Sequence, residues 1–466
     1  MAETTKTRQE KDSIGVKEVP IDAYYGIQTI RAAENFTITG LRTHPEIIRS
    51  AVKVKKAAAI TNLEAGKLEK KIADAMVAAC DEILAGKLLD QFITDPIQGG
   101  AGTSLNMNVN EVISNRAIEI LGGTKGDYKL VNPNDHANYG QSTNDVVPAS
   151  GRITIMVLLD KAIIELKRLH EAFSAKAKEF DPVIKMGRTH LQDAVPIRLG
   201  QEFKAFAAAI KRDINRFEEA KKTMRAVNMG GTAVGTCLNA DPVYLKKIAG
   251  NLSKVTGFDI VLADDIVDGT CNLDEFAYVS GVIKACAVSL LKICGDLRIM
   301  SSGPRCGLQE INLPPMQPGS SIMPGKVNPV IPEVVCQVAL NIIGNDTTVA
   351  LAASSGQLQL NVFEPVLFYN LFENIDTLAS AVKTLVDNCV VGISANAEKC
   401  KQHVENSVGI ITAINPYVGY TKASELAKEA ISTGTPVREL ILRDKLLTPE
   451  QLDKILDPFA MTEPAK

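Results

Sequence analysis

The sequence lacks the features of several large classes of protein. Among its 466 residues, 51 basic side chains nearly balance 54 acidic ones, and the formal net charge of -3 gives no reason to expect a nucleic acid or an anionic membrane as a partner. Met1–Gly15 is polar and lacks the apolar run of a secretory signal, and no later segment looks apolar for long enough to span a membrane. We therefore expect a cytoplasmic protein that acts on a small molecule.

Metal-binding and nucleotide-binding motifs are missing as well. Nine cysteines are scattered from Cys80 to Cys400 without a C-x-x-C pair, and the five histidines form no H-E-x-x-H motif. Neither a disulfide framework nor a dedicated metal site is therefore expected. The glycine-rich run Gly99–Gly102 supports nucleotide binding only weakly, because no G-x-G-x-x-G or G-K-[ST] accompanies it. No cofactor is predicted, and the sequence leaves activation by Mg²⁺ open.

Helical periodicity is the strongest pattern that is present. Apolar residues recur at spacings of three and four residues along the middle of the chain, which predicts long helices packed lengthwise in a bundle. Helices of this length need partners of equal length, so we expect a homo-oligomer. The apolar positions are Ile155, Leu159, Ala162, Leu166, Leu169 and Phe173; Phe276, Val279, Ile283, Cys286, Leu290, Ile293 and Leu297; and, within Gly200–Val227, Phe203, Phe206, Ile210, Ile214 and Phe217.

The pattern of apolar and polar residues changes on either side of this region. The N-terminal part mixes shorter helical patterns with loops rich in Gly, Asn and Pro, and the C-terminal part has short periods with turn signals at Asn415-Pro416 and Thr433–Pro436. We therefore predict a mainly α-helical protein with three domains. They are a mixed N-terminal domain (1–141), a long central helix bundle (142–396) and a small helical C-terminal domain (397–466).

Four segments interrupt the apolar texture with small polar residues. Helix capping by Thr103 or Ser142 would explain the first two, and a hydrogen-bonded histidine at a helix start would explain His190. The fourth differs, because two Pro-Gly pairs are combined with two serines, a lysine and an asparagine. It predicts a long non-helical loop with exposed backbone N–H groups, which a simple surface turn seldom needs. The segments are Gly99–Glu111, Gln141–Asp145, Gly187–Asp193 and Pro318–Pro329.

Together these segments resemble the motifs of the fumarase and aspartase superfamily. G-S-S-I-M-P-G-K-V-N-P at Gly319–Pro329 matches its signature, and G-T-S-L-N-M-N-V-N-E-V, Q-S-T-N-D and G-R-T-H-L-Q-D-A-V-P match the companion motifs in order. Thr143 and Val195 look like the aspartase branch, since fumarases usually carry serine and threonine there. The chain departs from the aspartase pattern at four positions, of which Gly140 is expected to loosen the loop before Ser142. The departures are Tyr139-Gly140, Cys237 and Phe363.

The resemblance implies a fold and a reaction. The fold would be the mixed N-terminal domain, long central bundle and small C-terminal domain of this superfamily, assembled as a homotetramer whose active sites are each built by three chains. The reaction would be the reversible deamination of L-aspartate to fumarate and ammonia through an enediolate intermediate. A fumarate hydratase or another ammonia-lyase of the superfamily is the nearest alternative. A catalytically silent structural homologue is a third, which the retained polar residues disfavour.

The chemistry of that reaction assigns roles to the polar residues. Charge that develops on the β-carboxylate needs fixed hydrogen-bond donors, and the hydroxyls suited to it are those of Thr103, Ser142, Thr143 and Ser321. Lys326 and Asn328 suit the α-carboxylate, and Asn144 and His190 suit the ammonium group. By resemblance, Ser320 is the general base as an alkoxide, stabilised by backbone N–H groups and Lys326. By resemblance too, Thr189 helps to hold the substrate and Glu333 orients His190.

Overall fold

The computed structural model describes residues 6–463, and most of them lie in α-helices; the strands form four short two-stranded sheets. The chain divides into two compact units. The first contains residues up to Ala162, Arg216–Lys284 and Asn341–Thr377, and the second contains Ile163–Asn215, Ala285–Leu340 and the residues from Leu378 onward. The long helices thus begin in one unit and end in the other.

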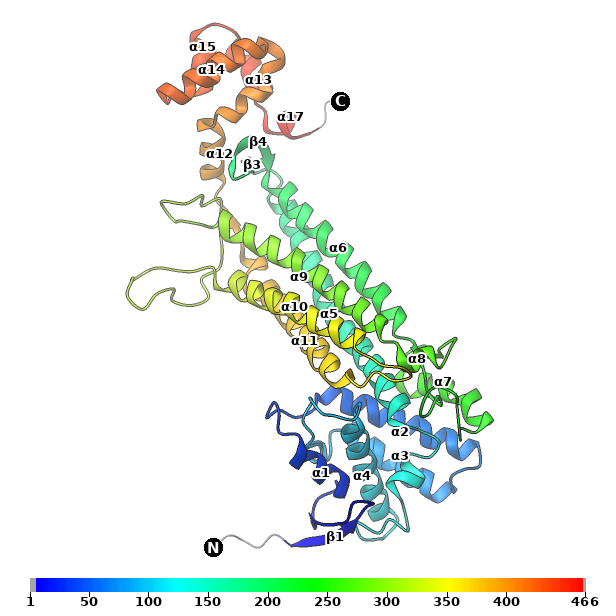
Figure 1. Cartoon of the computed structure of the whole chain (residues 1–466). Coiled ribbons are helices and arrows are strands. Elements are labelled where there is room, and N and C mark those ends of the chain that lie inside the picture. The colour runs from blue at the N-terminus through cyan, green and yellow to red at the C-terminus, as the bar shows by residue number, and fades with distance from the viewer. Residues whose placement is uncertain (1–5, 464–466) are drawn as a thin grey trace. The chain divides into compact units, whose positions relative to one another are not determined.

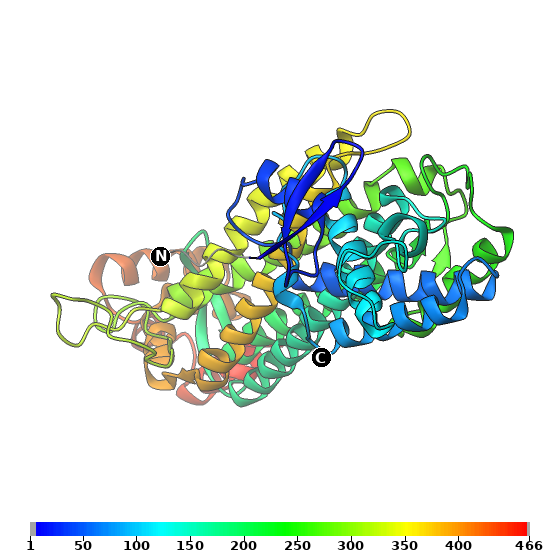
Figure 2. The same cartoon turned by 90° about the horizontal axis from the view of Figure 1, so that it is seen from below.

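The N-terminal part of the first unit consists of a hairpin and four helices. The strands β1 (Thr7–Lys11) and β2 (Val16–Pro20) pair antiparallel and form the dark blue hairpin of Figure 2. The helix α2 is central, because α3, α4 and the later helix α7 all pack against it. The helices are α1 (Ile27–Asn35), α2 (Pro45–Glu64), α3 (Lys70–Leu84) and α4 (Thr103–Ile120), followed by a π-helical turn at Pro133–Ala137.

Figure 1 shows five long helices, and three of them, α5, α6 and α9, bury the apolar stripes that the sequence predicts. One end differs from the prediction, since the helix expected over Gly200–Val227 stops at Thr223. Ala226–Val227 forms strand β5, which pairs in parallel with β6 (Val261–Leu262). The long helices are α5 (Thr143–Glu179), α6 (Leu199–Thr223), α9 (Asp274–Met300), α10 (Val330–Ser354) and α11 (Glu364–Asn388); α7 (Pro242–Thr256) and α8 (Asp268–Cys271) are shorter.

Contacts between aromatic rings hold the long helices together within each unit. In the second unit, Phe203 of α6 lies edge-on to Phe173 of α5 and to Phe180, which directly follows α5, with ring centroids 6.1 and 5.1 Å apart. In the first unit, Phe276 of α9 meets Phe368 of α11 at 5.2 Å. Burying one such side chain contributes about 2 kcal/mol, so these contacts hold the helices side by side.

Two of these helices correct an expectation from the sequence. By length and composition alone, α9 and α10 are apolar enough to cross a membrane. Core helices of soluble bundles meet the same criteria, and 50% of the relevant window of α9 and 33% of that of α10 are buried within the structure. Ser280 and Lys284 of α9 also bond the carboxylate of Asp346 on α10, at 2.8 and 2.5 Å. Charged groups in the middle of both helices are disfavoured in a bilayer core.

The rest of the second unit is a hairpin and a cluster of short helices. The strands β3 (Ile184–Thr189) and β4 (Gln192–Arg198) pair antiparallel, and α12 packs against β3. The turn expected at Thr433–Pro436 is confirmed, but Pro416 lies inside α13 and not in a turn. The remaining elements are β7 (Ile311–Asn312), β8 (Ser394–Ala395), α12 (Ala397–Asn406), α13 (Ile411–Val418), α14 (Tyr420–Thr433), α15 (Val437–Arg443), α16 (Pro449–Ile455) and α17 (Pro458–Thr462).

Candidate active site

Two helices of the first unit begin next to each other and bring two predicted site residues together. Thr103 is the first residue of α4 and Thr143 the first of α5, and their Oγ1 atoms lie 3.2 Å apart. Gly102 makes this approach feasible: its φ is +88°, and a Cβ there would lie 2.8 Å from Cγ1 of Val147 on α5. Free N–H groups at helix N-termini favour anions, so the two hydroxyls border a suitable place for a carboxylate.

Ser142 and Asn144 flank Thr143 and are held by their own local bonds. The Ser142 Oγ accepts the backbone N–H of Asn144 at 3.2 Å, so the capping that the sequence suggests is present there. Capping by Thr103 is absent, because its hydroxyl donates to the Gly100 carbonyl at 2.7 Å. The Asn144 amide donates to the Ala233 carbonyl at 2.7 Å, which leaves its oxygen as an acceptor for a cation such as a substrate ammonium.

A cavity of about 490 Å³ in the first unit includes Thr103 in its wall. Its lining also contains Gln28 and Arg31 of α1, and the Arg31 guanidinium forms a two-pronged ion pair with Asp12 at 2.7 and 3.0 Å. Hydrogen bonding to that guanidinium holds the pKa of Asp12 below its usual value. The volume suits a small dicarboxylate, and the polar lining suits its charge.

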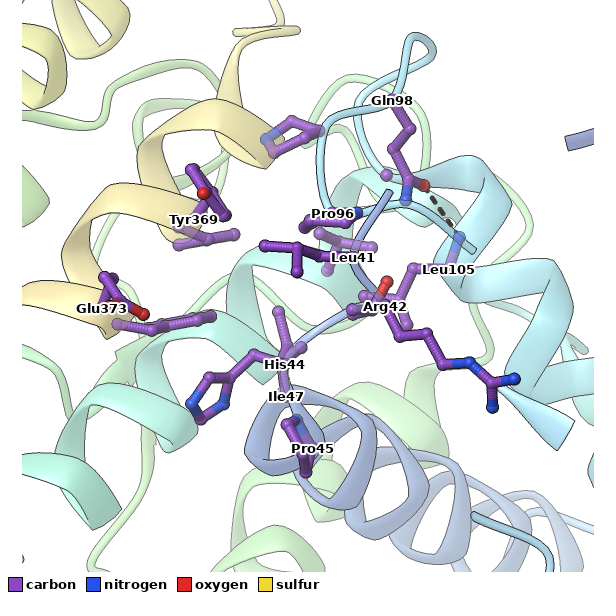
Figure 3. Close-up of a pocket in the computed structure, with 16 residues that line it drawn as sticks. Leu41, Arg42, His44, Pro45, Ile47, Pro96, Gln98, Leu105, Tyr369 and Glu373 are labelled. Atoms are coloured by element: carbon purple, nitrogen blue, oxygen red, sulfur yellow. Dashed lines mark hydrogen bonds between the residues drawn. The ribbon is translucent and has the colours of Figure 1, made fainter. Parts of the chain in front are cut away.

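A second cavity, of about 210 Å³, lies against Gly102 and is mainly apolar (Figure 3). Two of its polar neighbours are already engaged: the Gln98 oxygen accepts the Leu105 N–H at 2.9 Å, and His44 is paired with Asp376 at 2.9 Å. Binding an anion there would place its charge among mainly apolar side chains. The cavity that Thr103 lines is therefore the better candidate.

His190 lies at the tip of the β3–β4 hairpin in the second unit, directly after Thr189, the last residue of β3. The alternative of a histidine at a helix start is therefore wrong. His190 and Leu191 have φ of +56° and +60°, as the two central residues of a tight hairpin turn require. Both Thr189 and His190 are exposed. The hairpin thus leaves the His190 side chain exposed and outside the core of its unit.

Ser320 lies in a long non-helical loop, as predicted, which Figures 1 and 2 show extending from the helices of its unit. The Ser320 Oγ accepts the backbone N–H groups of Ile322 and Met323, at 3.2 and 3.0 Å. Two such donors favour the alkoxide form of a serine. The same loop carries Ser321 and Lys326, and both side chains are exposed.

Asn328 holds the loop closed on itself. Its amide donates to the Gly319 carbonyl at 2.6 Å, and the Gly319 N–H donates to the Lys326 carbonyl at 2.7 Å. A Cβ on Gly319 would lie 2.5 Å from that same carbonyl oxygen, so only glycine fits. This bracing fixes the stretch between Gly319 and Asn328 that contains Ser320.

The predicted residues fall into separate groups. Thr103, Ser142, Thr143 and Asn144 belong to the first unit, whereas Thr189, His190, Ser320, Ser321, Lys326, Asn328 and Glu333 belong to the second. Over residues 6–463, no hydrogen bond or ion pair joins His190 to Glu333, which lies in the first turn of α10. The orientation of His190 by Glu333 therefore stays a prediction.

Sequence reasoning missed two buried charges beneath Ser142–Asn144. Asp145 accepts the N–H groups of Ser142, Gly230 and Thr232 at 3.0 to 3.1 Å, and burial raises its pKa to about 6. Lys55 of α2 is fully buried, and burial lowers its pKa to about 7. Its position was readable, because Ala51, Lys55, Ala58 and Asn62 share the helix spacing of a buried face.

Comparisons with known proteins cover nearly all of the chain. A family model described as "Lyase" matches residues 15–344, and one described as "Fumarase C C-terminus" matches residues 410–463. An aspartate ammonia-lyase of Bacillus subtilis is 54% identical over 98% of this chain and 96% of its own. A Brucella melitensis structure titled fumarate lyase:delta crystallin bound to cobalt has a TM-score of 0.96 at 48% identity, covering 98% of this chain and 100% of that one. A class II fumarase of Schistosoma mansoni has a TM-score of 0.93 at 34% identity, covering 98% and 99%. These likenesses confirm the fold class expected from the sequence.

Proposed function

The chain belongs to the aspartate ammonia-lyases, within the superfamily of fumarases and aspartases, and we propose how its own residues carry out their reaction. It is a carbon–nitrogen lyase for a small dicarboxylate, converting L-aspartate reversibly to fumarate and ammonia. The single observation that supports the mechanism best is the Ser320 hydroxyl oxygen, which accepts two backbone N–H groups.

In this mechanism Ser320, as an alkoxide, removes the proton from C3 of aspartate. The electron pair moves into the β-carboxylate and forms an enediolate, and the C2–N bond then breaks to release ammonia and fumarate. Fixed donors stabilise such charge, and removal of one costs about 10²- to 10³-fold in rate. Thr103, Ser142, Thr143 and Ser321 would supply these donors. The glycine-rich loop around Ser320 would close over the substrate and exclude water.

The opposite end of the substrate would be held by different groups. Lys326 and Asn328 would bind the α-carboxylate, while Asn144, His190 and Thr189 would hold the ammonium group. Two anion sites separated by an ammonium site define an aminodicarboxylate, and the reaction requires no cofactor. Glu333 would orient His190 in the assembled enzyme.

We further propose a homotetramer in which three chains build each active site, located in the cytoplasm. The helices α9 and α10 leave large apolar side chains exposed: Val288 is 53%, Leu340 58% and Leu351 62% accessible. Apolar faces of this kind are typical of subunit interfaces. The exposed His190 hairpin and Ser320 loop would then meet residues of other chains.

L-aspartate is expected to be turned over far faster than L-malate. Asn144 and His190 present acceptors that suit an ammonium group, and the Thr143 context resembles aspartases. Fumarate formation followed by absorbance, first with L-aspartate and then with L-malate, measures the ratio. Equal or faster turnover of malate would instead assign the chain to the fumarate hydratases, to which the Schistosoma mansoni relative belongs by name.

Lys326→Ala is expected to raise KM for L-aspartate strongly, by about tenfold or more, with a smaller change in kcat. The exposed ammonium group of Lys326 supplies charge to the α-carboxylate, which changes little during the reaction, so its loss weakens ground-state and transition-state binding alike. Lys326→Arg, which keeps the charge, should give a smaller rise. An unchanged KM in Lys326→Ala would remove this residue from the site.

A further inference from the structure

Lys55 donates two hydrogen bonds inside the first unit, to side-chain oxygens whose directions are fixed independently. Its Nζ lies 2.8 Å from Oδ1 of Asn138 and 3.1 Å from Oε1 of Gln141. The amide nitrogen of Asn138 donates to the Gln141 carbonyl at 3.1 Å, and that of Gln141 donates to the carbonyls of Ala137 and Tyr139 at 3.2 Å. Carbonyl oxygens only accept, so both amides must turn their oxygens toward Lys55. A donor is therefore required at this position.

The chain of hydrogen bonds continues from Asn138 to Thr143. The same Asn138 oxygen accepts from the Asn106 amide nitrogen at 3.2 Å, and that nitrogen also donates to Oγ1 of Thr143 at 3.3 Å. Since an amide nitrogen only donates, the Thr143 oxygen accepts in this contact. The Thr103 hydroxyl lies 3.2 Å from the same Thr143 oxygen, and the hydroxyl hydrogen of Thr143 is left to point away from Asn106.

We propose that Lys55 is a positioning residue for the lyase reaction: it supplies the donors that hold the oxygens of Asn138 and Gln141 in place, and with them a buried hydrogen-bond chain through Asn138 and Asn106, so that Thr143 offers its hydroxyl hydrogen to the substrate carboxylate. The proposal rests on the proposed function of Thr143. Lys55 itself touches no substrate, because its side chain is fully buried beneath this loop.

Stability alone gives a poor account of a lysine at this place. Burial penalises its charged form and lowers its pKa to about 7, and an apolar side chain would avoid that cost. The charged group that faces it is the buried carboxylate of Asp145, with the thiol of Cys80 also near. Below the pKa the ammonium has three N–H groups and above it the amine has two, so both forms serve the two oxygens.

The test compares Lys55→Met with Lys55→Gln in the full-length oligomer. The two new side chains have similar size, but only glutamine can donate to Asn138 and Gln141. We expect Lys55→Met to lower kcat for L-aspartate by about tenfold to a hundredfold with a smaller rise in KM, because the donor matters most when the carboxylate gains charge. Lys55→Gln should keep at least tenfold more activity than Lys55→Met.

Thermal melting separates this role from a structural one. Lys55→Met leaves the Gln141 oxygen without its donor and should melt at a lower temperature than Lys55→Gln, so kcat is measured well below both melting temperatures, where both variants are folded. Lys176→Met is the matched control, since this buried lysine donates to Glu179 and to the Ile393 carbonyl and lies over the Phe180 ring, none of them a predicted site residue, and kcat should stay unchanged. Equal kcat of the two Lys55 variants at a temperature where both are folded would overturn the proposal.

Asn106→Leu provides a second route if Lys55→Met does not fold. This substitution removes the amide that donates to Thr143 and leaves Lys55 in place, so the same loss of kcat is expected. A folded Asn106→Leu variant with wild-type kcat would refute the inference. Failure of the wild-type protein to release fumarate from L-aspartate would refute the proposed function instead, so the two failures are distinguishable.

Discussion

Ser320→Ala is expected to abolish nearly all turnover while L-aspartate still binds. The substitution removes the general base, whose loss costs about 10²- to 10⁴-fold in kcat, and it leaves the Thr103, Thr143 and Lys326 contacts to the carboxylates intact. The Ile322 and Met323 N–H groups lose only the Ser320 oxygen that they share. Steady-state kinetics gives the loss of turnover, and titration calorimetry with L-aspartate gives the binding that remains.

The adjacent serine supplies the control for this experiment. Ser321→Ala removes one donor to the carboxylate but leaves the base, so its kcat should exceed that of Ser320→Ala while its affinity for L-aspartate is the weaker of the two. If Ser320→Ala kept most of its steady-state activity, another residue would be the base. The two N–H groups bonded to Ser320 would then serve only to fold the loop.

Two inactive variants are expected to restore activity to each other when they are refolded as a mixture. Ser142 and Ser320 lie in different units, and the proposed tetramer draws them from different chains. If Ser142→Ala and Ser320→Ala chains are unfolded, mixed equally and refolded, about a quarter of the sites receive both unmutated serines by random symmetric assembly. Fumarate formation should therefore reappear at about a quarter of the wild-type level.

Each variant refolded alone, and the two mixed without unfolding, are the controls and should stay inactive. Mass analysis must show that mixed oligomers have formed. If such oligomers produce no fumarate, the two serines of every site come from one chain, and the shared active site is ruled out.

The long helices could be predicted because the buried face of a helix requires apolar residues at spacings of three and four, and a single sequence shows this pattern. Phe203 and Phe217 recur with that period and are fully buried on α6. The end of α6 could not be predicted, because Ala226–Val227 pairs with a strand that is distant in the sequence. The turn predicted at Asn415-Pro416 was wrong for a local reason. Pro416 lies inside α13, and the helix ends only before Gly419, whose φ is +80°.

The candidate site shows a different limit of sequence reasoning. Resemblance marked Thr103 and Thr143, but only the structure shows their hydroxyls within 3.2 Å of each other. A helix start was one interpretation of His190, and its polar neighbours argued against it; the pairing of β3 with β4 puts His190 at a hairpin tip. Lys55 was overlooked because a lysine-rich stretch usually faces solvent. Its partners Asn138 and Gln141 come from a loop that local patterns do not connect to α2.

The backbone around Gly319 also bears on how this sequence can drift over generations. Every missense change in a glycine codon adds at least a Cβ atom, and at Gly319 that atom would collide with the Lys326 carbonyl at 2.5 Å. Selection for folding alone would therefore preserve this glycine, even in a lineage that had lost the reaction. Ser320 has no such protection, since alanine would fit its place. Among descendants of this chain, the glycine would mark common ancestry, and only the serine would mark retained catalysis.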